Sequence, residues 1–209
     1  MNNPHFRKLL WMVLLSPFLS FGQGGQYSGG AVAIGMRSTA NVFTADGASG
    51  LGAGGQFKIG ISKRVNTQWF LDYISSRIEE TGYRKDYHIG WSVQFGLGGE
   101  GFGEAGKVRP YILAGQCFDL TKVGIQNNTE SPLIFSAAAQ AGAGISWFPV
   151  SPLELTLQGQ WMAHLTKDVH IDWDAPTGPQ IHEEKGANFE GHLLFTLAAN
   201  LYFADLVKK

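Results

Sequence analysis

The densest group of side chains that could do chemistry lies in segment 166–188, near the end of the sequence. It combines a tryptophan with carboxylates and imidazoles, the groups that bind divalent cations: Asp168, His170, Asp172, Trp173, Asp174, His182, Glu183 and Glu184. Their spacing matches no specific metal motif, so a solvated, extended hairpin tip is the favoured interpretation. The alternatives are a ligand site formed by His170, Asp172, Trp173 and Asp174, or adhesion to a partner or sugar through Trp173.

A second group contains the residue types of a Ser–His–acid nucleophilic site. His164 and His192 share a strand face with acids such as Glu190, and Ser136 and Ser146 share the corresponding face of another expected strand. Such a triad requires hydrogen-bond contact between its members. Catalysis on a lipid would also require a site that opens toward the bilayer, whereas these residues are expected to face inward. We therefore predict no enzyme, and assign no catalytic residue, metal or cofactor.

Composition excludes several classes of protein. Of the 209 residues 28 are glycine and only 16% are charged, against about 25% in an ordinary soluble domain. The glycines form no phosphate-binding loop, and no basic patch suggests a nucleic-acid partner. The single cysteine, Cys117, excludes an internal disulfide framework and lies too far along the chain to carry a lipid anchor.

The first 23 residues are expected to be a cleaved signal peptide. Arg7 and Lys8 precede an uncharged run over 9–21, and Ser20 and Gly22 provide the small residues that a signal peptidase requires before cleavage next to residue 23. The run is shorter than the roughly 20 residues of a membrane-spanning helix, which disfavours a retained anchor. The mature part, 24–209, is then one domain with 14 basic and 17 acidic residues.

Hydrophobic alternation with period two predicts eight strands in this domain. It is clear in four segments, namely 51–62, 86–97, 153–165 and 189–203. It is less clear in four others, namely 29–37, 68–78, 108–119 and 133–148. In 108–119 the apolar face stays undecided, because Tyr111 and Leu113 compete with Ile112 and Ala114.

The polar face of these strands decides between two kinds of barrel. A soluble, lipocalin-like barrel is the alternative, but it would cover its outside with charged residues, whereas the polar face here is mostly Ser, Thr, Gln, Ala and Gly. Such a face suits a tight interior, and the opposite Leu, Phe, Ile and Trp face suits lipid. Because a sheet in hydrocarbon must close, we predict an all-β, eight-stranded antiparallel up-and-down transmembrane β-barrel. Its interior should be filled by side chains, without an open pore.

Charged and histidine side chains on the inward face are the candidates for a polar network in the lumen: Lys58, Asp72, His88, Glu154, His164, Glu190 and His192. With both termini in the periplasm, long connections over 38–50, 121–132 and 166–188 fall outside the cell. Short turns at 64–67 and 149–152 fall inside. Segment 79–85 is a modest outer loop and the glycine-rich 98–106 a longer inner turn.

Three short motifs carry a resemblance to a known family. They are Ser20-Phe21-Gly22-Gln23, Val108-Arg109-Pro110-Tyr111 and Leu201-Tyr202-Phe203. With these motifs in this order, the chain resembles small outer-membrane β-barrel proteins of the OmpX, OmpA-barrel and opacity type, most closely the variant common in Bacteroidota. The resemblance implies an outer-membrane location, contact with outer-membrane lipid, and Tyr202 and Phe203 as the signal read by the barrel-assembly machinery. The chain departs from it by continuing over 204–209, and no peptidoglycan-binding domain follows.

The sequence therefore favours a non-enzymatic barrel that presents extracellular loops for adhesion, envelope integrity or docking of an envelope or surface partner. Two alternatives remain open. One is an enzyme that modifies lipid A, as some members of the family it resembles are. The other is an accessory subunit of a secretion or assembly machine, as some barrels of this size are.

Overall fold

The computed structural model describes residues 29–43, 49–78, 81–98, 104–126, 131–165, 167–172, 180–185 and 191–207. The expected signal peptide, with its cleavage site, lies outside these residues. The described residues contain no helix long and apolar enough to cross a membrane.

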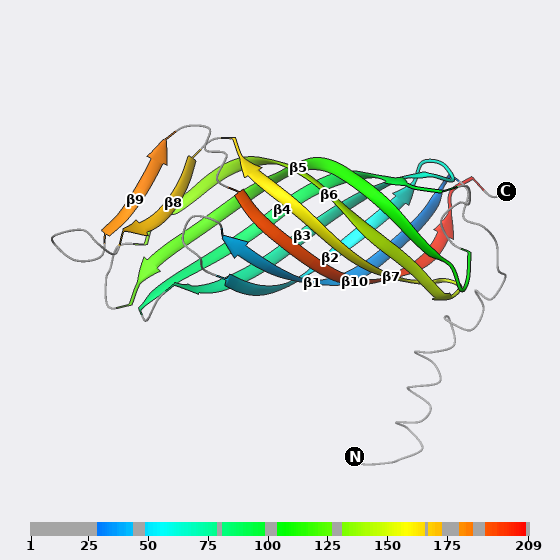
Figure 1. The fold of residues 1–209 in the computed structure, drawn as a ribbon, viewed down its shortest axis with the longest axis horizontal. Helices are drawn as coiled ribbons and strands as arrows, with labels where there is room; N and C mark the ends of the chain where they lie inside the picture. Colours follow the sequence, from blue (N-terminus) through cyan, green and yellow to red (C-terminus); the bar gives the residue numbers. More distant parts are fainter. Residues whose placement is uncertain are drawn as a thin grey trace, which may run out of the picture.

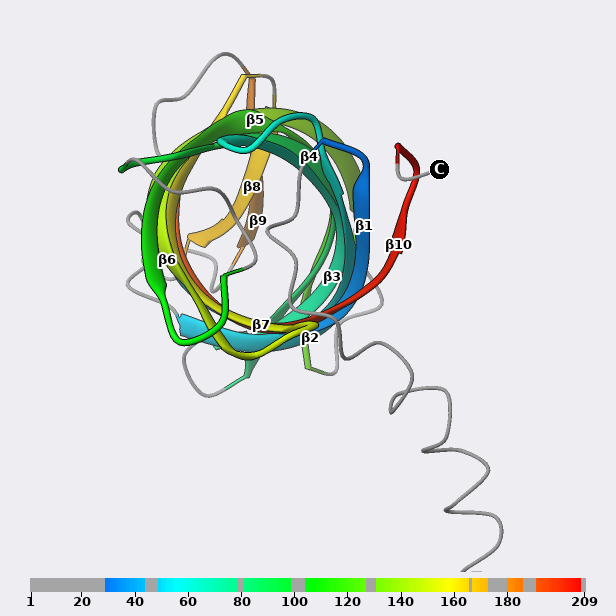
Figure 2. The ribbon, with the colours of Figure 1, turned by 90° about the vertical axis from the view of Figure 1, so that its right-hand side faces the viewer.

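Of the ten strands in the described residues, eight close into an antiparallel barrel in the order β1-β10-β7-β6-β5-β4-β3-β2 (Figures 1 and 2). The barrel strands are β1 (Ala31–Phe43), β2 (Ser49–Gly60), β3 (Val65–Ile78), β4 (Gly82–Gly96), β5 (Val108–Ile125), β6 (Leu133–Val150), β7 (Leu153–His164) and β10 (Gly191–Asp205). The predicted fold class is confirmed.

Closure depends on the first and last strands. β1 pairs with β10 from Ala31 opposite Asp205 to Phe43 opposite His192, and its other edge pairs with β2. Every barrel strand therefore has a partner on both sides, so the backbone amides and carbonyls of the sheet are satisfied within it. This is the condition for a sheet in hydrocarbon.

Side chains divide sharply between the two faces of the barrel. Large apolar groups point outward, as at Met36 and Leu197, which are 79% and 61% exposed, while polar groups fill the interior. Strand β5, whose facing stayed undecided in the sequence, places Ile112 and Ala114 outside. Tyr111 lies inside, where its hydroxyl donates to Gln158 Oε1 at 3.1 Å.

Three expected outer loops were too long, because backbone pairing continues past the clear apolar alternation. The expected loop 79–85 shrinks to 79–81, since β4 begins at Gly82. The expected outer loop 38–50 shrinks to 44–48, because β1 continues to Phe43. Ser38 and Ala40 still face outward and pair with β2. The expected loop 121–132 shrinks to 126–132, since β5 continues to Ile125. Of the outer connections only 165–190 is long.

That connection carries a second, two-stranded sheet. β8 (Lys167–Asp172) and β9 (Gln180–Lys185) pair antiparallel, with His170 opposite His182. Figure 1 shows this hairpin at the end of the barrel away from the C-terminus. We call that end the loop end, and the end where β1 begins and β10 stops the terminal end.

Candidate functional site

The interior near the terminal end is built around a buried ion pair. Lys58 Nζ on β2 donates to both carboxylate oxygens of Glu154 on β7 at 3.0 Å. Ser146 Oγ donates to Oε1 of Glu154 at 2.7 Å, and Asn200 Nδ2 and Tyr202 Oη donate to Oε2 at 3.1 and 3.3 Å. The carboxylate on β7 thus accepts from donors on three other strands, β2, β6 and β10, which ties the four strands together across the lumen.

Amide side chains extend this network around the wall. Gln94 Nε2 donates to Gln68 Oε1, Gln68 Nε2 to Gln56 Oε1 at 3.0 Å, and Gln56 Nε2 to Asn200 Oδ1 at 2.6 Å. Each link joins two neighbouring or nearby strands. Because buried amides cost free energy unless paired, the chain of bonds fixes the register of the strands it connects.

A second ion pair lies further toward the loop end. Arg37 Nε is 3.0 Å from Asp72 Oδ1, and both side chains are fully buried. The guanidinium lies over the Phe70 ring, 4.3 Å from its centroid, and its Nη2 donates to Thr196 Oγ1 at 3.2 Å. Gly54 makes room for this arrangement, since a Cβ there would collide with the Asp72 carboxylate.

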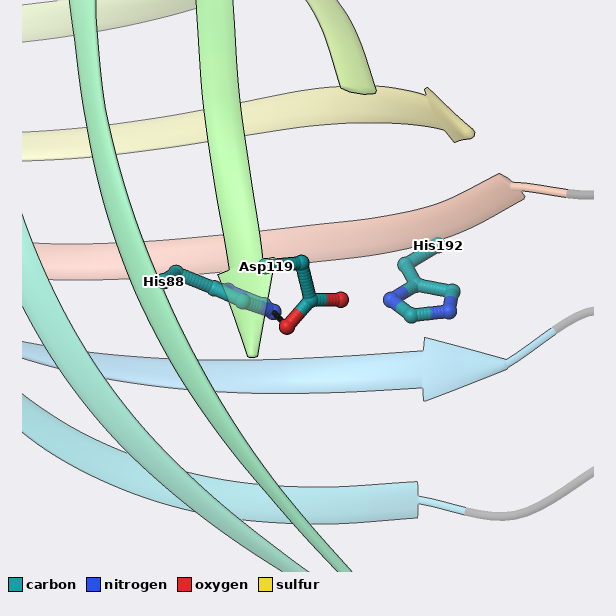
Figure 3. Close-up of side chains that lie close together, drawn as sticks. All are labelled: His88, Asp119 and His192. Atoms are coloured by element: carbon teal, nitrogen blue, oxygen red, sulfur yellow. Dashed lines mark ion pairs between the residues drawn. The ribbon is translucent and has the colours of Figure 1, made fainter. Parts of the chain in front are cut away.

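Three histidines surround one aspartate closer to the loop end. His88 Nε2 on β4 lies 3.4 Å from Asp119 Oδ1 on β5, and His164 Nε2 on β7 lies 3.9 Å from Asp119 Oδ2. His192 Nε2 on β10 is 3.3 Å from His164 Nε2. Figure 3 shows His88, Asp119 and His192 directed toward one another inside the barrel. All four side chains are buried. We call these four residues the histidine cluster.

Arg84 closes this layer. Its Nε donates to Asp86 Oδ1 at 2.9 Å, and its Nη2 lies 3.5 Å from His192 Nε2. Thr121 Oγ1 also donates to Asp86, at 2.8 Å. Arg84 is therefore engaged mainly by Asp86, with one edge toward the histidine cluster.

The structure separates the residues expected to form one lumen network into different layers. Lys58 and Glu154 form the terminal-end pair, Asp72 pairs with Arg37, and the three histidines group around Asp119. Glu190 lies outside the described residues.

The other expected sites fall partly beyond the described residues. Trp173 and Asp174 lie outside them, and only the backbone of His170 and Asp172 is described, within β8. Of the two serines considered for catalysis, Ser136 lies 3.0 Å from His164 Nδ1 and Ser146 contacts Glu154 instead. These serines therefore belong to different layers.

Among the described residues, sequence reasoning missed five inward-facing charges, namely Arg37, Arg84, Asp86, Arg109 and Asp119. The signal was present, because each occupies the inward parity of its strand. For example, Arg37 alternates with the outward Met36 and Ser38. The last strands have few charges on their inward face, whereas β1, β4 and β5 together have several.

The two residues of the expected assembly signal face opposite ways. Tyr202 is buried in the lumen on Glu154, whereas Phe203 is 46% exposed on the outer face. Tyr202 therefore has a place in the interior network, and Phe203 is the accessible aromatic of the last strand.

The two ends of the barrel differ in charge. The connections at the loop end are 44–48, 79–81, 126–132 and 165–190, and they contain ten acidic and two basic residues. The connections at the terminal end are 61–64, 97–107 and 151–152, and they contain two acidic and three basic residues. The loop end is thus strongly acidic in sequence.

Comparison with known proteins supports the fold and goes no further. No protein-family model matches the sequence, and no curated protein is similar to it in sequence. Among solved structures, the outer membrane protein OprG from Pseudomonas aeruginosa is 11% identical with a TM-score of 0.59, over 86% of this chain and 98% of that chain. Neisserial surface protein A is 12% identical with a TM-score of 0.55, over 83% and 96%.

A third similar structure is Ail, the attachment invasion locus protein of Yersinia pestis, solved in complex with the heparin analogue sucrose octasulfate. It is 13% identical with a TM-score of 0.50, over 83% of this chain and 97% of that chain. The chain therefore has the fold of a small eight-stranded outer-membrane β-barrel. At these identities the likeness carries neither lineage nor activity.

Proposed function

We propose that the protein is an integral outer-membrane barrel without an open pore, and that it works through the surface presented at its loop end, in adhesion, envelope integrity or partner docking. The observation that carries this proposal is the filled interior. Ion pairs and amide chains join strands that are not neighbours in the barrel, so the lumen is occupied by bonded side chains rather than by a water column.

The outer face supports the membrane location. Aromatic rings lie side by side along it: Phe57 stacks on Trp69 with centroids 5.9 Å apart, and Trp69 and Trp91 are tilted with centroids 6.1 Å apart. Such aromatic groups are typical of the interfaces of membrane barrels. A water-soluble barrel would have to expose these rings, at a cost of roughly 25 cal/mol per Å² of apolar surface.

The charge of the loop end favours a cationic or cation-bridged partner. Segment 167–185 contains five acidic and two basic residues. A polyanion such as the heparin analogue bound by Ail would be repelled by such a segment. We expect instead basic protein surfaces, or anionic glycolipid phosphates bridged by divalent cations.

Replacing 167–185 by a short Gly-Ser linker tests whether the hairpin makes the surface interactions while the barrel serves only as its scaffold. The barrel should still remain folded in detergent at room temperature. The pairing of β7 with β10 begins at Ala163 opposite Gly191 and does not use the hairpin. Cell-surface adhesion or partner recovery should fall. Unchanged surface interactions in a folded, correctly inserted variant would contradict the assignment to this hairpin.

Fractionation and conductance test the rest of the proposal. The protein should extract from outer membranes only with detergent, and in planar bilayers it should give no steady open channel. Recovery from the soluble periplasm without detergent, or a stable conductance, would contradict it.

A lipid-modifying enzyme is the second candidate, and the contact of Ser136 Oγ with His164 Nδ1 at 3.0 Å favours it. Against it, Ser136 is 4% exposed and faces the lumen, while the barrel wall is paired on both edges of every strand. An acyl chain in the bilayer has no described route to this hydroxyl. Lipid A mass spectra from cells with the wild type and Ser136→Ala test the idea, and a modification that depends on Ser136 would establish it.

An accessory role in a secretion or assembly machine predicts a stoichiometric partner. Gentle detergent extraction and affinity capture of the full chain should then recover one protein in equal amount. Capture of the barrel-assembly machinery alone would indicate biogenesis rather than function.

A further inference from the structure

The histidine cluster contains a buried carboxylate, Asp119, whose ion-pair contacts among the described residues are to imidazoles. The buried acids Asp72, Asp86 and Glu154 each have a Lys or Arg partner at 2.9–3.0 Å, whereas Asp119 lies 3.4 Å from His88 and 3.9 Å from His164, with Arg84 acting on it electrostatically. A buried carboxylate is costly unless it is paired or coordinates a metal. The interior therefore favours one additional positive charge at Asp119.

Hydrogen bonding leaves this position incompletely satisfied. Neither nitrogen of His88 and neither oxygen of Asp119 makes a hydrogen bond, although all are buried, and their closest approach is the 3.4 Å contact. That is longer than the roughly 2.7–2.9 Å of a charge-assisted hydrogen bond. The two groups face one another at a distance that two ligands of one ion can have, with the ion to one side of the line that joins them.

The spacing fits a metal ion. Ligand atoms about 2.1 Å from one tetrahedral ion lie about 3.4 Å apart. His88 Nε2 and Asp119 Oδ1 are 3.4 Å apart, and the Nε2 atoms of His164 and His192 are 3.3 Å apart. One ligand atom from each of His88, Asp119 and His192 lies within 4.8 Å of the others. His164 stands outside this group of three, with Nε2 3.9 Å from Asp119 Oδ2, so the side chains must rotate for all four to reach one ion.

The surroundings orient two of the imidazoles. Ser136 Oγ holds His164 Nδ1 at 3.0 Å, which directs Nε2 toward Asp119 and His192. A hydrogen bond to the second ring nitrogen is the usual way to fix a metal-binding histidine. Arg84 Nη2 donates toward His192 Nε2 at 3.5 Å, so this nitrogen carries a lone pair, which becomes available to an ion when Arg84 turns away from it. When Ser136 accepts from His164 Nδ1–H, two imidazole lone pairs point at each other, an arrangement that a cation stabilises.

We propose that His88, Asp119, His164 and His192 form a buried site for one divalent first-row transition metal ion. Three imidazoles and a carboxylate suit zinc, cobalt, nickel or copper rather than calcium or magnesium, which prefer oxygen ligands. Neighbouring Arg84 does not oppose the ion strongly, because its charge is balanced by Asp86 at 2.9 Å. The site would hold together β4, β5, β7 and β10 near the loop end.

The test uses the mature protein without a histidine tag, folded in detergent micelles, freed of metal by a chelator and titrated with Co²⁺. A histidine-rich tetrahedral site should give visible cobalt absorption that saturates at one ion per barrel and disappears on addition of Zn²⁺. The alternative source of positive charge at Asp119 is a proton on one of the imidazoles instead of a metal ion. Absence of stoichiometric cobalt binding would overturn the proposal.

A matched control separates the cluster from the hairpin. The chain has six histidines. The double variant His170→Ala/His182→Ala of the mature protein, which lacks residues 1–23, retains only His88, His164 and His192. X-ray absorption of the zinc-loaded double variant should still show imidazole in the first coordination sphere. Loss of binding in this variant, or a sphere without imidazole, would place the ion elsewhere.

Single substitutions then assign the ligands. His88→Ala and Asp119→Asn should weaken binding more than about 100-fold, and Ser136→Ala about 10- to 100-fold, the usual loss for an outer-sphere partner. Mobility of the unheated protein on SDS gels reports folding. Folded variants that bind as the wild type does would overturn the assignment. If a variant does not fold, the double variant still decides, because it leaves the cluster intact.

Discussion

Lys58 Nζ lies 3.0 Å from both carboxylate oxygens of Glu154, although the two residues stand on β2 and β7, which are separated in the barrel by β1 and β10. The pair therefore spans the lumen. Its energy depends on burial, since both side chains are fully shielded from solvent.

Glu154→Leu should destabilise the barrel by about 3–5 kcal/mol, because it leaves the Lys58 ammonium buried without a counter-charge. Guanidinium unfolding in micelles measures the loss. Lys58→Met/Glu154→Leu is the matched control and should lose less than the single variant, although it still leaves Ser146, Asn200 and Tyr202 without their acceptor. A double variant as unstable as the single one would show that the charge is not the cause.

Gly54→Ala and Gly55→Ala should differ although the residues are adjacent. A Cβ at Gly54 would collide with Asp72 and the Leu71 carbonyl, so we expect a loss of about 1–3 kcal/mol. At Gly55 the nearest atom to an added Cβ is the Gly35 carbonyl oxygen at 3.8 Å, so stability should be unchanged or slightly raised. Equal midpoints of unfolding would contradict the inward position of Gly54.

Leu197→Arg should reduce insertion into lipid vesicles. Leu197 is 61% exposed in the middle of β10, where an arginine at the bilayer midplane costs about 2–4 kcal/mol. Leu206→Arg is the control, because Leu206 is 72% exposed but follows the end of β10 at the membrane rim. If the barrel were soluble, the two variants would behave alike.

Cys117 provides an intrinsic reporter of unfolding. It is the single cysteine and is 1% exposed inside the barrel, so maleimide should label it only after denaturation. The labelled fraction should follow the unfolding curve measured by tryptophan fluorescence. Rapid labelling of the native protein would contradict the packing of β5.

The fold was predictable because alternate residues of a membrane-spanning strand face lipid and the lumen, and so alternate between apolar and polar. On β7 and β10 that pattern is clear enough to give the correct facing, for instance Thr196 inside and Leu197 outside. On β5 it failed because Tyr111 and Leu113 are apolar but inward, where the lumen has its own apolar layer with Phe148. Alternation cannot separate an apolar interior layer from lipid contact.

The candidate site was only half predictable. Parity assigns His88, His164 and His192 to the interior, but their meeting around Asp119 depends on the stagger between β4, β5, β7 and β10. That stagger sets which positions share a level, and it emerges from pairings such as His88 with Asp119 and Gly191 with Ala163. The sequence of one strand contains no such information.

The pairing of β1 with β10 has a consequence for biosynthesis. Ala31 must meet Asp205, so the wall is complete only when the barrel strand that comes latest in the sequence is present. A nascent or C-terminally shortened chain has two bare sheet edges, at β1 and β7, that water can solvate but hydrocarbon cannot. The joining of those two edges is therefore the step that lets the wall enter hydrocarbon with its backbone satisfied.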